Sequence, residues 1–242
     1  MQQFPSNLAL NQEIESPNAL NNDRDAEYQD LQRVDKNART VLHRAALDQN
    51  YSLVTQLCER AEKIGLGHYV DTIDKFGNTP LLSACVVHNY QTSRYKLQCI
   101  QALIQNKADP NKKNDTTLWT PLTWCSFYGE TEAIKKLLEN KGFPYLVDNE
   151  GRFPLDHCGL QDKHGNRKKA ATVLIESLVQ LIQKFDENPE KLAYEGYTDY
   201  RRHLGSPLLR TSVLYWAIYF KLDVDGYVKK LLAMNGVYPE LP

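Results

Sequence analysis

The sequence has almost no net charge and no long apolar run, and each absence excludes a class of protein. Its 29 Lys and Arg residues nearly balance 30 Asp and Glu residues, which gives a formal net charge of −1. This balance provides no electrostatic reason to expect nucleic acid or an acidic membrane as a ligand. No stretch reaches the roughly 18 apolar residues of a membrane span, and no apolar segment of a secretory signal follows Met1. We therefore expect a cytoplasmic protein without a membrane span.

Cysteine is scarce, and its spacing does not fit a metal site or a disulfide framework. The sequence has no C-x-x-C pair, and the intervals of 27, 14, 26 and 33 residues between cysteines match no zinc template. Free cysteine behaves as a small apolar residue that is usually buried. We expect no metal or other cofactor, and we expect core positions for all of the cysteines: Cys58, Cys85, Cys99, Cys125 and Cys158.

Signatures of catalysis are also missing. The chain has no glycine-rich phosphate loop, no H-E-x-x-H and no G-x-S-x-G sequence. Asp156, His157 and Cys158 together look like a catalytic string, but consecutive residues of a helix point in different directions. We expect no catalytic residues and no enzymatic activity.

The sequence does contain one short pattern that occurs five times: Thr, Ser or Phe, then Pro or Val, then Leu, opening a run of apolar and small residues. The copies begin at Thr40, Thr79, Thr120, Phe153 and Ser212. Their start positions differ by 39, 41, 33 and 59 residues. One interval equals the period of about 33 residues expected of a helix–turn–helix array, and the others exceed it by loop-sized insertions. The units of such an array bury their apolar faces only against their neighbours.

The residues around this pattern resemble the ankyrin repeat family. Residues 74–81 (D-K-F-G-N-T-P-L) look like the β-hairpin tip and helix start of an ankyrin repeat, and residues 99–111 look like its second helix and exit turn. The resemblance covers roughly residues 35–242 and implies an all-α, ankyrin-repeat solenoid of helix–turn–helix units with β-hairpin-like loops. An Asp five residues before the start of the first helix recurs at Asp35, Asp74, Asp115 and Asp148.

The chain is expected to divide into an arm and an array. Residues 1–30 are polar, with too few apolar residues to offset the entropy of ordering, so we expect them to be disordered. Residues 31–242 form the array, with repeats expected near 35–73, 74–114, 115–147, 148–206 and 207–242. Helices are expected at 41–49, 51–63, 80–88, 95–106, 121–128, 131–140, 170–185, 213–221 and 226–234. The unmatched segment 186–206 is either a functional or partly helical insertion or a tolerated surface loop.

In ankyrin arrays the contact surface is a concave face built from the hairpin tips and the exposed sides of the first helices. The resemblance puts Leu208, Leu209 and Thr211 in the last hairpin, and it puts many large aromatic residues on this face. Such residues are frequent in interface hot spots, because they bury much apolar area on binding. The partner-binding residues expected from the resemblance are Phe76, Trp119, Phe127, Tyr128, Arg152, Tyr219 and Phe220.

An alternative for these aromatic residues is burial beneath the inserted loops. Trp124 and Trp216 are expected to pack between repeats. His43 occupies the position at which a histidine of the family braces the hairpin, so we expect a structural role for it.

The sequence therefore favours a non-enzymatic protein–protein interaction module, acting as an adaptor, scaffold or inhibitor whose partner is another protein. Two alternatives remain open. The chain is the regulatory or targeting ankyrin region of a larger enzyme or channel, or it is a bacterial effector delivered into a host cell cytoplasm. The sequence identifies neither the partner nor the oligomeric state.

Overall fold

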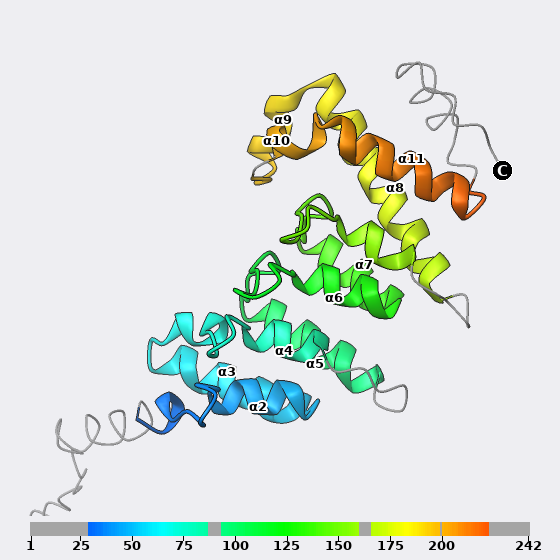
Figure 1. Cartoon of the computed structure of the whole chain (residues 1–242). Helices are drawn as coiled ribbons and strands as arrows, with labels where there is room; N and C mark the ends of the chain where they lie inside the picture. The colour runs from blue at the N-terminus through cyan, green and yellow to red at the C-terminus, as the bar shows by residue number, and fades with distance from the viewer. Residues whose placement is uncertain (1–28, 87–92, 160–165, 199, 223–242) are drawn as a thin grey trace, which may run out of the picture.

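The computed structural model describes residues 29–86, 93–159, 166–198 and 200–222 (Figure 1). Nearly all of the predicted polar arm and the predicted helix at 226–234 lie outside these residues. Within these residues the regular elements are helices. The β-type pairing found there is one isolated antiparallel bridge between Val34 and Thr40. The prediction of an all-α fold is confirmed.

The helices follow one another in pairs joined by short hairpin-like loops. In chain order they are α2 (Val41–Leu47), α3 (Tyr51–Lys63), η1 (Gly67–Asp71), α4 (Pro80–Val86), α5 (Ser93–Gln105), α6 (Pro121–Tyr128), α7 (Thr131–Glu139), η3 (Pro154–Gly159), α8 (Asn166–Glu187), α9 (Pro189–Tyr194), α10 (Tyr200–Leu204) and α11 (Pro207–Tyr219).

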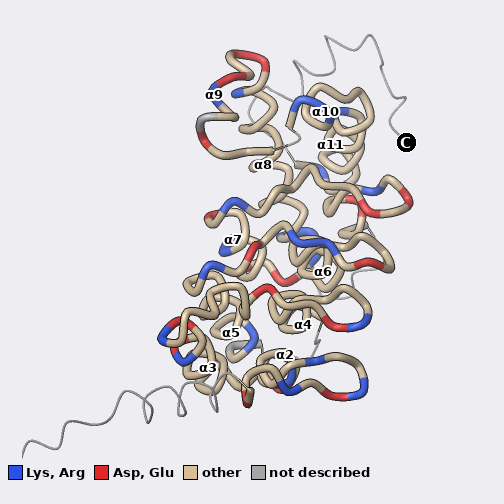
Figure 2. The backbone as a smooth tube through the Cα atoms, turned by 90° about the vertical axis from the view of Figure 1, so that its left-hand side faces the viewer, with Lys and Arg blue, Asp and Glu red and all other residues tan. Residues whose placement is uncertain are grey.

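The pairs stack into two columns. The first helices of the pairs contact one another in the order α2, α4, α6, η3 and α11, and we call them the inner helices. The second helices, α3, α5, α7 and α8, also contact one another in order, and we call them the outer helices. Figure 2 shows α2, α4 and α6 one above the other, with α3, α5 and α7 in a second row beside them. This arrangement is the solenoid that the repeated pattern predicts.

In the first three repeats the Thr that begins the repeated pattern caps the inner helix. In the third repeat the side chain of Thr120 accepts a hydrogen bond from the backbone of Thr123, the Thr123 side chain accepts one from the Thr120 backbone, and Pro121 begins the helix. Proline suits this place because the first helical N–H has no intrahelical partner. At the other end of α6, Gly129 has φ +70°, and an added Cβ would lie only 3.1 Å from the Arg167 backbone nitrogen. Glycine therefore allows both the helix ending and the close approach of α8.

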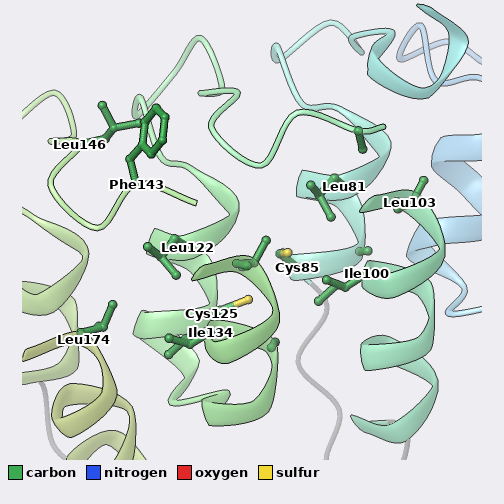
Figure 3. Packing of buried hydrophobic residues seen from close by; sticks show 14 of the residues in the cluster. Leu81, Cys85, Ile100, Leu103, Leu122, Cys125, Ile134, Phe143, Leu146 and Leu174 are labelled. Carbon is green, nitrogen blue, oxygen red and sulfur yellow. The ribbon is translucent and has the colours of Figure 1, made fainter. Parts of the chain in front are cut away.

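The core runs along the stack between the two columns. Figure 3 shows buried side chains of successive pairs, among them Leu81, Cys85, Ile100, Leu122 and Cys125. All five cysteines are buried free thiols, as predicted. Burial raises the pKa of the Cys58 and Cys99 thiols to about 12, so both remain protonated at neutral pH.

The repeated Asp closes the hairpin in three of the loops. Oδ1 of Asp74 accepts the backbone N–H groups of Phe76 and Asn78, both at 2.9 Å. Oδ1 of Asp148 accepts those of Glu150 and Arg152 in the same way, also at 2.9 Å. These bonds replace water on backbone donors that the tight turn leaves without other partners.

In the third repeat the recurring Asp, Asp115, does not play this part. Asn114 does so instead, and its side-chain oxygen accepts the N–H groups of Thr117 at 3.2 Å and Trp119 at 3.0 Å. This hairpin is one residue longer than the others, so the closing residue comes six positions before Thr120 rather than five. Asp115 lies at the tip, where its N–H donates to the Phe76 carbonyl at 3.1 Å.

The last inner helix also differs from the prediction. Helix α11 begins at Pro207 and not at residue 213, with Ser206 as its cap, so Leu208, Leu209 and Thr211 lie in a helix and not in a hairpin. The cause is the Ser-Pro start signal together with the spacing of Leu209, Val213 and Ala217, all fully buried on one side of the helix.

The fourth repeat is the least regular. Its first helix is the short 3-10 helix η3, and its outer helix α8 has 22 residues. The segment 186–206, whose nature the sequence leaves open, contains α9 and α10 at the C-terminal end of the stack (Figure 1).

Candidate functional site

The structure places the seven predicted contact residues on hairpins and at the ends of inner helices. Phe76 is in the second hairpin, Trp119 closes the third, and Arg152 closes the fourth. Phe127 and Tyr128 end α6, Tyr219 ends α11, and Phe220 follows it. The structure does not bring all of them together.

Four aromatic rings of the third repeat form what we call the third-repeat cluster: Trp119, Trp124, Phe127 and Tyr128. The ring centroids of Trp119 and Trp124 are 4.4 Å apart in an edge-on contact, and those of Trp119 and Phe127 are 5.5 Å apart. Trp124 stacks on Tyr128 with centroids 6.0 Å apart and an interplanar angle of 17°. All four side chains are half-buried. Trp124 packs against the core, as predicted, and also belongs to this cluster.

Cations from neighbouring helices hold two of these rings. The side chain of Lys96 in α5 is buried, and its Nζ lies 5.2 Å from the centre of the Tyr128 ring and 3.3 Å from Oε1 of Glu130. The Arg167 guanidinium at the start of α8 lies 5.4 Å from the centre of the Phe127 ring. Such cation–π contacts fix the orientation of the rings. Burial raises the pKa of Tyr128, so its hydroxyl stays neutral.

A second group of rings, the α11 cluster, lies on the last described inner helix and directly after its end: Tyr215, Trp216, Tyr219 and Phe220. The Tyr215 and Tyr219 rings stack with centroids 6.3 Å apart, and each side chain is 58% exposed. Trp216 donates from Nε1 to Oδ1 of Asp156 at 2.7 Å, which confirms its predicted packing between repeats. Tyr215 is not among the contact residues expected from the sequence. With the helix start expected at residue 213, Tyr215 takes the position that His43 has in the first repeat, where the side chain braces the hairpin.

Two consecutive residues of η3 connect these clusters. The His157 ring lies 4.6 Å from the Trp119 ring, while Asp156 accepts the bond from Trp216. The two clusters and this connection form one aromatic band that runs from the third repeat to α11. The band is a product of the fold, since its members are up to 101 residues apart along the chain.

Asp156, His157 and Cys158 do not face one point, as the helical geometry predicts. Asp156 contacts Ser212 and Trp216, whereas Nε2 of His157 lies 3.1 Å from Oδ2 of Asp148, and Cys158 faces the Ser126 carbonyl at 3.6 Å. Three consecutive side chains thus have three separate sets of partners. Burial lowers the pKa of His157.

Two predicted residues lie outside the aromatic band as defined. Phe76 is 41% exposed, and the Lys75 ammonium lies 4.9 Å from the centre of its ring. Arg152 bonds Oδ2 of Asp148 through Nε at 3.0 Å and pairs with Glu150 at 2.8 Å, so it mainly closes its own hairpin.

Backbone hydrogen bonds join successive hairpins near these residues. Lys75 N–H donates to the Asn37 carbonyl at 2.9 Å, and Asn149 N–H donates to the Thr117 carbonyl at 3.1 Å. Together with the bond from Asp115 to Phe76, they hold the row of hairpins as one surface. In the described ranges we find neither a group of His, Cys, Asp and Glu side chains fit to hold a metal ion nor a helix long and apolar enough to cross a membrane.

Comparison with known proteins agrees with the fold. Residues 90–186 match a family model described as ankyrin repeats, in three copies. This stretch contains the whole third-repeat cluster and the fourth hairpin, whereas Phe76 and the α11 cluster lie outside it. A search of curated proteins gives no match to the chain.

Proposed function

We propose that this chain, which carries ankyrin repeats, is a non-enzymatic adaptor, scaffold or inhibitor that binds a partner protein along its aromatic band. Ankyrin repeats are generally protein–protein interaction modules. The specific role and the binding face, taken as the concave side formed by hairpins and inner helices, belong to the proposal. The observation that carries it is the pair of aromatic clusters on the third repeat and on α11, which two consecutive residues of η3 connect.

The composition of the band supports protein binding. Exposed rings offer large apolar area on stiff side chains, and clusters of such residues are typical of interface hot spots. Tyr215 and Tyr219 are more than half exposed, while Trp119 and Trp216 are held by contacts with the fourth repeat. A surface whose rings are already ordered loses little entropy when a partner binds.

The experiment compares two tyrosine sites of similar exposure. Tyr215 and Tyr219 belong to the band, whereas Tyr95 is 50% exposed on the outer helix α5. The partner is first identified by affinity capture with the full chain and then titrated as a purified protein. We expect Tyr215→Ala with Tyr219→Ala to weaken binding at least tenfold, which is about 1.4 kcal/mol, and Tyr95→Ala to leave it unchanged. Equal affinity of the double variant and the parent chain would remove the proposal.

The place of action is also proposed to be the cytoplasm. The five buried free thiols support this, since reduced cysteines persist in that compartment. Fractionation of cells with an antibody against the chain tests it, and recovery in a membrane or secreted fraction would contradict it.

A further inference from the structure

The insertion between α8 and α11 is anchored to the array by specific contacts. The hydroxyl of Tyr145 donates to the Thr198 carbonyl at 2.7 Å, and Nζ of Lys141 donates to the Glu195 carbonyl at 2.7 Å. Leu192 in α9 and Leu204 in α10 are fully buried. The insertion therefore packs against the repeats.

A pocket of about 640 Å³ lies between the insertion and the array, and we call it the insertion pocket. The array side comes from residues in 109–113 and 143–153, and the insertion side from residues in 198–208. Its volume is in the range of about 300–1,000 Å³ that is typical of ligand sites. Gly151 lines the pocket and also belongs to the fourth hairpin, so the pocket adjoins the row of hairpins.

The floor of the insertion pocket is apolar. Phe143, Leu146 and Phe153 line it with side chains that belong to the buried core. At the insertion side stands Leu208, which is 75% exposed, the largest exposure among the large apolar residues of the described chain. An apolar side chain entering from a partner would cover Leu208 and contact the floor, and the removal of this area from water would stabilise the complex.

The rim of the pocket carries more positive than negative side chains. Lys113, Arg202 and His203 line it, against a single lining carboxylate, Asp109. Lys113 is positioned by donating from Nζ to the Val147 carbonyl at 2.8 Å, and the His203 ring stacks on Tyr145 with centroids 6.0 Å apart. A carboxylate at this rim would meet two permanent cations, and such complementarity favours an acidic partner over a basic one.

We propose that the insertion pocket binds a segment of the partner protein that carries an apolar side chain next to a carboxylate. This inference rests on the proposed function, because it extends the contact surface from the hairpins onto the insertion. It also gives the 186–206 segment a role that a plain array would not have.

The test uses the full chain and a small probe with the chemistry of the proposed segment. N-acetyl-phenylalanine carries a phenyl ring beside a carboxylate, and N-acetyl-phenylalaninamide is its neutral match. Both are titrated by NMR. We expect the acid to shift the signals of Leu208, Gly151 and Leu146, and to bind about tenfold more tightly than the amide, as a charge pair at a partly exposed rim allows. Equal binding of the two compounds, or shifts confined to other parts of the chain, would overturn the proposal.

Variants separate the pocket from the aromatic band. Arg202→Glu should weaken binding of the acid about tenfold, whereas Arg44→Glu, an exposed arginine on α2, should have no effect. Tyr215→Ala with Tyr219→Ala should leave probe binding unchanged. If the tyrosine variants do not affect the protein partner while the probe still binds the pocket, the proposed function fails and the pocket stands. If Arg202→Glu binds the probe as tightly as the parent chain does, the proposal for the pocket fails and the proposed function is not affected.

Discussion

The indole N–H of Trp216 donates a 2.7 Å hydrogen bond to Oδ1 of Asp156, which ties the last described inner helix to the fourth repeat. The same oxygen accepts the hydroxyl of Ser212 at 2.5 Å, and Oδ2 of Asp156 accepts the backbone N–H of Phe153 at 2.7 Å. One carboxylate thus caps η3 and positions the α11 cluster. This side chain offers a direct test of how the aromatic band is held.

Asp156→Ala should destabilise the chain by about 2 kcal/mol, because hydrogen bonds to a charged group are lost and a half-buried indole N–H is left without its acceptor. Asp156→Asn keeps an acceptor oxygen and should cost less. The measurement is urea unfolding followed by tryptophan fluorescence, with Asp186→Ala, which removes a partly exposed ion pair to Arg210, as the control. Equal stability of Asp156→Ala and the parent chain would contradict this role.

Substitutions in the third-repeat cluster should weaken partner binding without unfolding the chain. Trp119→Ala with Tyr128→Ala should reduce affinity for the protein partner at least tenfold, because two large rings leave the band. Both side chains are half-buried on the face of the stack, so the far-ultraviolet circular dichroism of the variant should keep the helical signal. Partner binding should also change the tryptophan fluorescence of the parent chain. Retained affinity in the double variant would show that the cluster is only a packing unit.

His43 predicts a loss of stability in mild acid. Its Nε2 lies 2.9 Å from the Asn78 carbonyl and therefore carries a proton, so Nδ1 is the acceptor of the Thr40 N–H at 3.2 Å. A second proton would remove this acceptor, and burial lowers the pKa of His43 below the usual value.

The sign of the effect follows from the lowered pKa. Just below the unfolded pKa of about 6.5 the unfolded chain binds more protons than the folded chain, so the free energy of unfolding falls as pH falls. His43→Gln should reduce this slope between neutral and mildly acid pH, with a part remaining from His157, whose pKa is also lowered. His68→Gln, a substitution of an exposed histidine, is the matched control. An unaltered slope in His43→Gln would refute the assignment.

Aspartate should be able to replace Asn114 as the residue that closes the third hairpin. Asn114→Asp should preserve stability within about 0.5 kcal/mol, because a carboxylate accepts the same backbone N–H groups, as Asp74 and Asp148 do. Asn114→Ala should cost about 1–2 kcal/mol, since the N–H groups of Thr117 and Trp119 lose their acceptor. Thermal unfolding measures both. Asp115→Ala is the comparison, and a larger loss of stability there than in Asn114→Ala would contradict the role of Asn114.

The sequence predicted the regular part of the stack well. The bounds of α3 and α6 agree with the predicted 51–63 and 121–128, because a side-chain cap marks the start of both helices and a glycine with positive φ follows the end of each. His43 lies in a capping box and bonds the next hairpin, as its position in the pattern predicted.

The irregular part could not be predicted from the pattern alone. The Ser212-Val213-Leu214 copy lies inside α11, where a match to the repeat motif hid the earlier Ser-Pro start. The extra residue of the third hairpin shifted the closing position from Asp115 to Asn114. The connection of the two aromatic clusters depends on the opposite directions of Asp156 and His157, which only the three-dimensional arrangement defines.

The length of α8 makes the two ends of the stack different. At 1.5 Å per residue its 22 residues span about 33 Å, whereas the 9 residues of α7 span about 14 Å. The additional turns provide the surface on which α9 and α10 rest, and the shorter outer helices offer no equivalent. A molecule lying along the inner column would therefore meet unlike chemistry at its two ends, so a reversed orientation would not reproduce the same set of contacts.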